Sequence, residues 1–302
     1  MKRLSIIIVT YHSEKDIYDS LASVWKFCDI PHEELEVIVV DNSPECEPMF
    51  TKLKELYGDD IVLIHNTHNG GYGQGNNVGI RRCTAPVFMI MNPDVRLCEP
   101  VFHHCLKQFE QNGKLVLYGF TQRQGDGSLG HSTAWVNTVW PYVAEPMRLL
   151  TGKLNLFWSR YMYVTGACFF MRKESFVKAG LFDESIFMYG EEEDIHDRLM
   201  KLPGAKMGYA RHLSYLHLHP VPSDMSKESH DWLKGTLKSL LLINRRNGIS
   251  DSRTVGYAIK RNNISIWKEQ LKYVLTGGKN RDRRDYFQQW KRILQQEAGF
   301  LK

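Results

Sequence analysis

Four consecutive carboxylates at residues 191–194 (Glu-Glu-Glu-Asp) are the strongest candidates for acid–base chemistry in this sequence. A helical pattern begins directly after them at Ile195, so the acids are expected at a helix start, where the dipole and free N–H groups favour negative charge. An exposed glutamate has a pKa of about 4.3, so it is ionised at neutral pH and can accept a proton from a hydroxyl nucleophile. An acidic helix start without catalytic function would have the same pattern. The spacing does not choose among Glu191, Glu192 and Asp194 as the base.

A further acid, Asp94, follows a predicted strand and closes the run Asn92-Pro93-Asp94, where the proline fixes the turn. One aspartate binds a divalent cation poorly, but Mg²⁺ or Mn²⁺ takes one or two protein ligands together with diphosphate oxygens and water. A second ligand could come from His217 or His219, and imidazole suits Mn²⁺ better than Mg²⁺. A core histidine that is hydrogen-bonded within the fold would fit the same spacing.

Two other polar segments follow predicted strands. Asp41, in VIVVDNS, could accept hydrogen bonds from a nucleobase N–H or a ribose hydroxyl, although a turn aspartate bonded to its own backbone is the plainer interpretation. Residues 69–79 (NGGYGQGNNVG) permit close backbone approach to a ligand, but they lack the third glycine of a dinucleotide fingerprint. Asp41, Asn69 and Asp94 all come just after strand ends, where ligands gather in parallel sheets.

Short apolar, β-branched segments alternate with helical patterns along the first part of the chain. Strands are expected at residues 4–9, 35–40, 61–64, 87–91 and 115–120, and helices at 17–28, 50–57 and 101–109. The glycine- and asparagine-rich residues 69–79 are expected to form a turn that runs into a helix carrying Ile80. This alternation predicts an α/β fold with a mostly parallel sheet and helices on both faces. Ser13 is expected to cap the first helix. Residues 133–150 have no clean period and are interpreted as a mobile or acceptor-facing segment, whereas residues from 226 onward are helical in pattern.

Composition and charge set further bounds. The 302 residues contain no apolar run of membrane-spanning length. The short N-terminal apolar run is expected to be a strand rather than a signal peptide. The six cysteines are scattered along the chain, which indicates reduced thiols in a cytosolic protein. From residue 225 onward there are 17 Lys/Arg against 7 Asp/Glu (17 − 7 = +10), although the whole chain carries only +5. This basic extension suggests an anionic partner, which we expect to be a membrane surface rather than nucleic acid; a solvated helical surface is the alternative.

Taken together, these motifs resemble those of family 2 glycosyltransferases with a GT-A fold, particularly the bacterial rhamnosyltransferase-like branch. The resemblance rests on SIIIVTYHSEKDI (5–17), VIVVDNSP (37–44), NGGYGQGNNVGI (69–80), MNPDVRL (91–97) and residues 164–199, in the expected order. It implies a Rossmann-like, nucleotide-diphospho-sugar transferase domain over residues 1–225, followed by a basic helical extension over 226–302. It also implies transfer of a sugar from a nucleotide-sugar donor to a hydroxyl of a saccharide or lipid-linked acceptor, with inversion at the anomeric carbon, in cell-surface polysaccharide synthesis.

The resemblance also assigns residues of the donor site by position. The donor-site residues it implies are Thr10, Tyr11 and Asp41 at the nucleoside, Asn69, Gly71 and Asn76 nearby, Asn92 and Asp94 at the metal motif, and Gly166 and Ala167 beside the donor sugar and acceptor. Mg²⁺ or Mn²⁺ would bind Asp94, with His217 as the late histidine that joins the metal. The first carboxylate of the family's DxD motif is absent here, because Asn92 stands in its place.

The catalytic Glu-Asp pair of the family falls on Glu191 and Glu192, which makes Glu192 the expected base. Aspartate is usual at that position, and the extra methylene of Glu192 makes Asp194 a plausible substitute. Two other functions fit parts of the pattern: a catalytically impaired nucleotide-sugar-binding relative, and a sugar nucleotidyltransferase, for which the first loop offers only Lys15 to hold a triphosphate. The expected location is cytoplasmic, with a peripheral position at the inner face of the plasma membrane if the membrane hypothesis holds.

Overall fold

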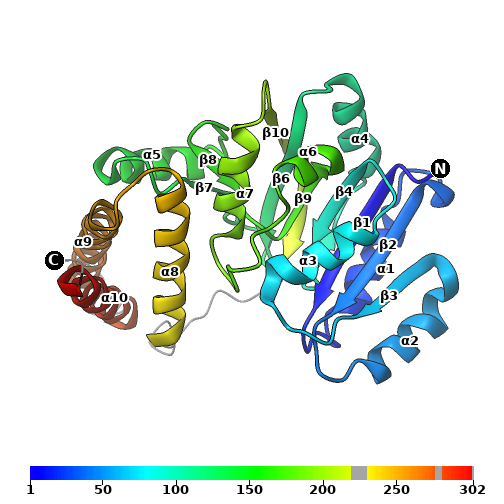
Figure 1. The fold of residues 1–302 in the computed structure, drawn as a ribbon, viewed down its shortest axis with the longest axis horizontal. Coiled ribbons are helices and arrows are strands. Elements are labelled where there is room, and N and C mark those ends of the chain that lie inside the picture. The colour runs from blue at the N-terminus through cyan, green and yellow to red at the C-terminus, as the bar shows by residue number, and fades with distance from the viewer. Residues whose placement is uncertain (219–229, 276–280, 301–302) are drawn as a thin grey trace. The chain divides into compact units, whose positions relative to one another are not determined.

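The computed structural model describes residues 1–218, 230–275 and 281–300 (Figure 1). The chain forms two compact units. The first, called the sheet unit, contains residues 1–134 and 155–219, and the second, called the helical unit, contains residues 135–154 and 220–302. The division expected near residue 225 therefore differs in one respect, because residues 135–154 group with the C-terminal helices.

The sheet unit is built on one eight-stranded sheet with the order β3-β2-β1-β4-β9-β6-β10-β5. Its strands are β1 (Leu4–Thr10), β2 (Leu35–Asp41), β3 (Ile61–His65), β4 (Val87–Met91), β5 (Val95–Leu97), β6 (Leu115–Gln124), β9 (Cys168–Arg172) and β10 (Lys206–His217). Strands β1 to β4 pair in parallel, as do β6 and β10, whereas β9 is antiparallel to β4 and β6, and β5 is antiparallel to β10. The predicted mostly parallel α/β sheet is confirmed. Strands β7 (Thr133–Trp135) and β8 (Met162–Val164) form a separate small sheet.

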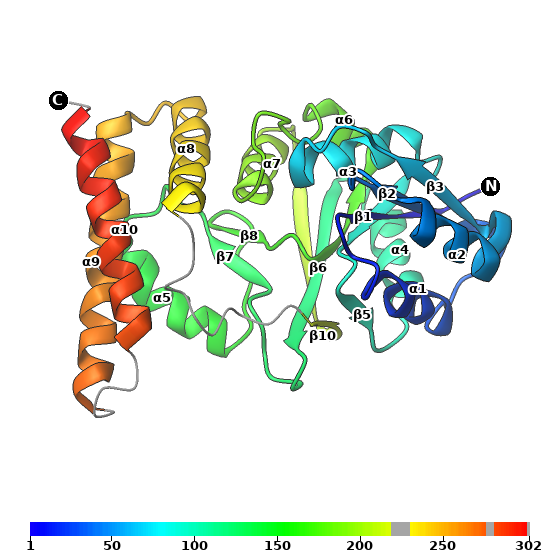
Figure 2. The same cartoon turned by 90° about the horizontal axis from the view of Figure 1, so that it is seen from below.

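Both faces of the sheet are covered by helices. Figure 2 shows α1 (Ile17–Lys26), α2 (Glu47–Tyr57) and α4 (Phe102–Gln111) on one face, and α3 (Gly71–Arg82), α6 (Lys173–Lys178) and α7 (Glu191–Met200) on the other. Two short 3₁₀ turns, His32–Glu34 and Gly58–Asp60, precede β2 and β3. Successive side chains of a strand point to opposite faces, so Ile6 and Ile8 join one core and Ile7 joins the other. Burial on both faces explains why these strands are continuous apolar runs.

Two sequence-based expectations about helices are wrong. Helix α1 begins at Ile17 with Asp16 at its N-cap, and the Ser13 hydroxyl donates to the Tyr11 carbonyl instead of capping the helix. The turn expected over residues 69–79 is also wrong over most of its length, because α3 begins at Gly71. The segment at residues 133–150, for which no element was predicted, contains helix α5 (Pro141–Lys153) with Pro146 inside it.

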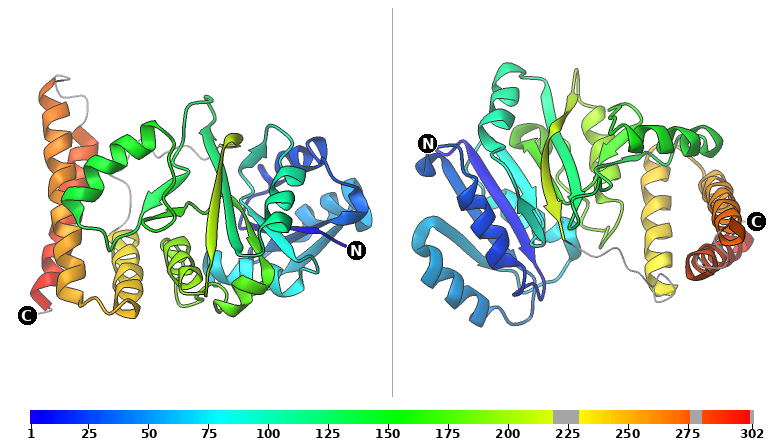
Figure 3. Two further views of the ribbon diagram at one scale, coloured as in Figure 1. Left: turned by 90° about the horizontal axis from the view of Figure 1, so that it is seen from above. Right: turned by 180° about the vertical axis from the view of Figure 1, so that it is seen from behind.

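The helical unit combines α5 with α8 (His230–Arg246), α9 (Asp251–Leu275) and α10 (Arg281–Phe300), which confirms the helical pattern expected for the described part of this region. Helices α9 and α10, orange to red in Figure 3, lie side by side. Leu237, Val255 and Leu294 form a small buried core where α8, α9 and α10 meet. Within the described residues, no helix combines the length and apolarity needed to cross a membrane.

Candidate active site

The parallel strands bring the predicted nucleoside residues to one edge of the sheet. Thr10 ends β1, Asp41 ends β2, and the two residues are partners in the β1–β2 register. Asn92 follows the end of β4, which pairs in parallel with β1 on its other side. Because these strands run in the same direction, their carboxyl ends and the residues that follow them meet at one edge.

Asp41 has an incompletely satisfied carboxylate at this edge. Its Oδ1 accepts hydrogen bonds from Thr10 Oγ1 (2.7 Å) and Ser43 Oγ (2.9 Å), and the residue is 1% exposed. Its Oδ2 is buried and has no hydrogen-bond partner. An unmet buried acceptor is costly, so a ligand N–H or O–H group would complete the set. Tyr11, next to this site, is half exposed, and its ring packs edge-to-face with the His12 ring (centroids 4.4 Å apart).

The glycine-rich segment at the start of α3 packs closely against the chain before α7. Gly71 has φ +89°, and a Cβ placed on it would lie 1.9 Å from the Phe187 carbonyl oxygen. The Asn69 side-chain oxygen accepts a hydrogen bond from the Gly71 N–H (3.1 Å). The close backbone approach that the glycines allow is therefore to the protein's own chain at Phe187. Asn76 is fully buried in α3, and its Oδ1 has no partner.

Residues 166 and 167 connect the two predicted reaction elements. The Gly166 backbone hydrogen-bonds the Glu192 carboxylate, and a Cβ placed on Gly166 would lie 2.0 Å from Glu192 Oε1. The Ala167 carbonyl accepts a hydrogen bond from the Asn92 N–H (2.8 Å). The acids of α7 and the Asn92-Pro93-Asp94 turn thus lie on either side of a two-residue segment.

Tyr72 is a site residue that sequence reasoning missed. Its hydroxyl donates a hydrogen bond to the Gly166 carbonyl (2.6 Å), and burial, followed by the charge of Glu192, raises the pKa of this phenol. Tyr72 therefore holds the segment against which Glu192 packs. Its position inside NGGYG was the only signal in the sequence.

Strand pairing brings the predicted metal ligands Asp94 and His217 together. His217 lies opposite Val95 in the β5–β10 ladder, and His217 Nε2 is 3.2 Å from Asp94 Oδ2. Both side chains are about one-fifth exposed, at 20% and 17%. His219, the alternative ligand, lies outside the described residues. A carboxylate and an imidazole at this distance fit Mn²⁺ when substrate oxygens complete the shell. The described part of the chain has no group of three or more His, Cys, Asp or Glu residues arranged to hold a metal alone.

Helix α7 begins at Glu191, directly after Tyr189 (φ 69°) and Gly190 (φ 109°), whose left-handed conformations turn the chain into the helix. The predicted acidic helix start is confirmed. Glu191 is 2% exposed, and its Oε1 has no partner. Burial, and then the neighbouring charge of Glu192, raises the pKa of Glu191 to about 9. Burial also raises the pKa of Glu192, although part of this residue remains accessible to solvent.

Asp194, the alternative base, is engaged in a structural ion pair. Its Oδ2 accepts hydrogen bonds from Arg198 Nε (2.9 Å) and Nη2 (2.5 Å), one helical turn away. The same guanidinium donates to the carbonyls of Ala179 and Leu181, so Asp194 and Arg198 tie α7 to the chain after α6. This i, i+4 pair could have been recognised in the sequence.

The raised pKa of Glu191 predicts a pH-dependent stability difference. The folded pKa of about 9 exceeds the ordinary value of 4.5, so the stabilisation is complete below about 4.5 and is lost as pH rises towards 9. Glu191→Gln removes this titration. We therefore expect the free energy of unfolding of Glu191→Gln, measured by urea denaturation, to increase relative to that of the wild type. The difference should grow by about 1 kcal/mol for each pH unit as the pH rises through this range. The exposed control Glu45→Gln should show no such trend, and a constant difference for Glu191→Gln would contradict a buried, protonated carboxyl.

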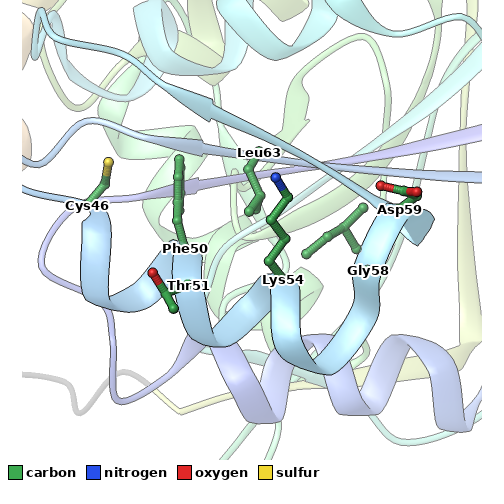
Figure 4. A pocket seen from close by; sticks show the side chains of 8 residues that line it. Cys46, Phe50, Thr51, Lys54, Gly58, Asp59 and Leu63 are labelled. Carbon is green, nitrogen blue, oxygen red and sulfur yellow. The ribbon is translucent and has the colours of Figure 1, made fainter.

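A pocket of about 350 Å³ lies between α2 and β3, away from these groups (Figure 4). The side chains of Phe50 and Lys54 rise from α2 towards Leu63 of β3. None of the predicted donor, metal or catalytic residues lines this pocket. It therefore plays no part in the site.

The sequence was compared with protein-family profiles and with known proteins, and the matches identify its family. The sequence profile of Glycosyl transferase family 2 matches residues 5–180, which is more than half of the 302 residues. The low-salt glycan biosynthesis hexosyltransferase Agl10 of Haloferax volcanii is 26% identical over 236 residues, covering 75% of this chain and 71% of that protein.

Two solved structures share the fold. The mannosyltransferase PcManGT from Pyrobaculum calidifontis, in complex with GDP-Man and Mn²⁺, has a TM-score of 0.61 and 13% identity, covering 99% of this chain and 88% of its own. The structure of S. aureus TarS has a TM-score of 0.56 and 16% identity, and this chain covers 42% of its length, with 86% of this chain aligned. These likenesses support the predicted GT-A-like fold. From the family profile, the chain belongs to glycosyl transferase family 2 and is a glycosyltransferase.

Proposed function

We propose that this enzyme transfers a hexosyl or deoxyhexosyl group from a nucleotide-sugar to a hydroxyl of a saccharide or lipid-linked acceptor, with inversion and with a divalent cation, in cell-surface polysaccharide synthesis. One observation carries the proposal: the segment 166–167 is hydrogen-bonded to Glu192 on one side and to Asn92 on the other. The Glu192 carboxylate and the Asn92-Pro93-Asp94 turn therefore lie close together, which supports their proposed roles as base and as cation site. Membership of the family favours glycosyl transfer over nucleotidyl transfer.

The nucleoside end of the donor would bind at the carboxyl edge of β1 and β2. The unpartnered Asp41 Oδ2 supports this placement, because uracil, thymine and guanine each present a ring N–H to such an acceptor. Thr10 and Ser43 hold the other oxygen, which fixes the carboxylate plane. Tyr11 would offer its exposed ring to the base.

Asp94 and His217 would hold Mn²⁺ or Mg²⁺ together with the donor diphosphate. When bound, the cation would neutralise the charge that develops on the leaving diphosphate. The structural relative PcManGT carries Mn²⁺ with its nucleotide-sugar, which is consistent with this assignment.

Glu192 would act as the base. Burial raises the pKa of Glu191 to about 9, so its carboxyl group keeps its proton at neutral pH and is not the proton acceptor in this assignment. The Gly166 backbone hydrogen bond orients that carboxylate. It would take the proton of the acceptor hydroxyl as the acceptor oxygen attacks the anomeric carbon and the bond to the diphosphate breaks. Attack from the side opposite the leaving group inverts the configuration.

The experiment that tests this function is a thermal-shift screen of nucleotide-sugars with and without Mn²⁺, followed by NMR analysis of the product. The screen includes dTDP-rhamnose, which the rhamnosyltransferase-like resemblance suggests, and UDP-glucose, UDP-galactose and UDP-galactofuranose. We expect Mn²⁺-dependent stabilisation by one donor and a product of inverted anomeric configuration. A retained configuration would contradict the mechanism, and donor binding without turnover or slow hydrolysis would indicate an impaired relative.

Asp41→Asn tests the nucleoside site. The amide places an N–H group or a weaker acceptor where the carboxylate meets the base, so we expect the Kd of the donor to rise about 10- to 100-fold. The kcat at saturating donor should change much less, because Asp41 does not contact the reacting atoms in this assignment. Isothermal titration calorimetry with the free nucleoside diphosphate measures the effect. The matched control is Asp59→Asn at the pocket beside α2, which should leave binding unchanged; equal losses would overturn the assignment.

A further inference from the structure

Helix α5 carries its apolar side chains on the outside. Tyr142, Val143, Leu149 and Leu150 are 52%, 48%, 58% and 49% exposed. Tyr142 and Leu149 are seven residues apart, as are Val143 and Leu150, so these two neighbouring pairs lie on one broad face of the helix two turns apart. The opposite side buries Ala144, Glu145 and Thr151. A surface helix of a globular protein has the reverse arrangement.

The buried side of α5 is used for an ionic contact. Glu145 accepts a hydrogen bond from Lys268 Nζ (3.0 Å) and lies 3.8 Å from Arg261 Nε, both on α9. The Glu145 side chain is only 5% exposed. The packing of α5 on α9 therefore includes a charged cluster, and the exposed apolar side chains of α5 take no part in that cluster.

The C-terminal half of α9 also exposes apolar side chains and buries polar ones. Trp267, Leu271 and Val274 are 66%, 47% and 68% exposed, and their spacing of four and three residues puts them on one stripe. The residues that this half buries include Asn262 and Glu269. The N-terminal half is ordinary, since Val255 is buried in the core of the helical unit.

The exposed charged residues on these two helices indicate an anionic partner. Helix α5 and residues 252–275 of α9 contain one acid each, Glu145 and Glu269, and both are buried beside cations. The exposed charged residues of these two segments are therefore all basic: Arg148, Lys153, Arg253, Lys260 and Lys272. Exposed tryptophan and leucine with flanking lysine and arginine are typical of helices that lie in the interface of an anionic membrane.

We propose that the helical unit docks on an anionic membrane surface through the exposed faces of α5 and the C-terminal half of α9. The helices lie on the membrane without crossing it, since no described helix is suited to span it. The apolar side chains enter the acyl boundary and the lysines and arginines meet lipid phosphates. This docking does not depend on the sugar, the cation or the base of the proposed reaction. It would bring the enzyme to an acceptor that is anchored in the membrane.

Co-sedimentation with vesicles tests the proposal on the full chain. We expect binding to vesicles of phosphatidylcholine with phosphatidylglycerol, much weaker binding to phosphatidylcholine alone, and loss of affinity as salt rises. The variant Leu149→Gln/Leu150→Gln/Trp267→Gln/Leu271→Gln should lower the partition coefficient about tenfold or more. The matched control, Leu56→Gln/Val177→Gln, changes residues of similar exposure (55% and 51%) in the sheet unit and should bind as the wild type does.

Three results would overturn the proposal: equal sedimentation with neutral and anionic vesicles, unchanged binding of the fourfold variant, or a wild-type dimer that the variant converts to monomer without any vesicle binding. The last result would assign the apolar faces to a second copy of the chain. Circular dichroism and donor hydrolysis in solution should match the wild type in all variants. Retained hydrolysis with lost docking separates this proposal from the proposed reaction.

Discussion

Glu192→Gln is expected to lower kcat by about 10²- to 10⁴-fold while the Kd of the nucleotide-sugar stays within a factor of about two. The amide keeps the size of the side chain and its contact with the Gly166 backbone, but it cannot take a proton from the acceptor hydroxyl. Single-turnover kinetics with saturating donor and acceptor isolates this step, and calorimetry measures donor binding separately.

Asp194→Asn provides the comparison. Its carboxylate is bonded to Arg198, which also holds two backbone carbonyls, so this change should lower the stability of the fold more than the rate of the chemical step. An unchanged kcat in Glu192→Gln together with a large loss in Asp194→Asn would move the base to Asp194. A comparable loss in Glu191→Gln alone would move it to Glu191.

Asp94→Asn is expected to reduce kcat/KM about 100-fold at limiting Mn²⁺, because it removes the one carboxylate that the Asn92-Pro93-Asp94 turn offers to a cation. Raising the Mn²⁺ concentration should restore part of the activity. Chelation with EDTA should abolish turnover in the wild type and in the variant.

The partner residue has a matched control on its own strand. His217→Gln should raise the apparent Mn²⁺ requirement, whereas His212→Gln, at an exposed position of β10, should leave it unchanged. Wild-type activity that persists fully in EDTA would contradict a cation at this pair and would leave Asp94 and His217 as a structural contact.

The ranges of strands β1 to β4 could be predicted closely from the sequence because these strands are buried. Strands that are buried on both faces must be continuous apolar runs, and turn residues bound them on either side, so β1 to β4 lie within one residue of their expected ranges. Strand β5 was missed because three residues give no periodicity. Helix α5 was missed because Pro146 stands inside it, where proline usually breaks a helix.

The site is less accessible to sequence reasoning because its key contacts are long-range. The approach of His217 to Asp94 depends on the β5–β10 pairing, which joins segments more than a hundred residues apart. The raised pKa of Glu191 depends on burial that no local pattern reports. The environment of Asp41 was more predictable, since its partners Thr10 and Ser43 lie at the ends of neighbouring strands.

The short connection at residues 166–167 has a consequence for the geometry of the proposed reaction centre. Gly166 contacts Glu192, the proposed base, and the Ala167 carbonyl accepts a hydrogen bond from Asn92, in the proposed cation turn. Only two residues of chain, about 7 Å when extended, therefore separate the two contacts. A side chain at residue 166 would overlap the carboxylate. In every nucleoside-diphosphate sugar the anomeric carbon is joined through one oxygen to the diphosphate. The short backbone link therefore suits the reaction centre that all such donors share, and it does not by itself distinguish one sugar from another.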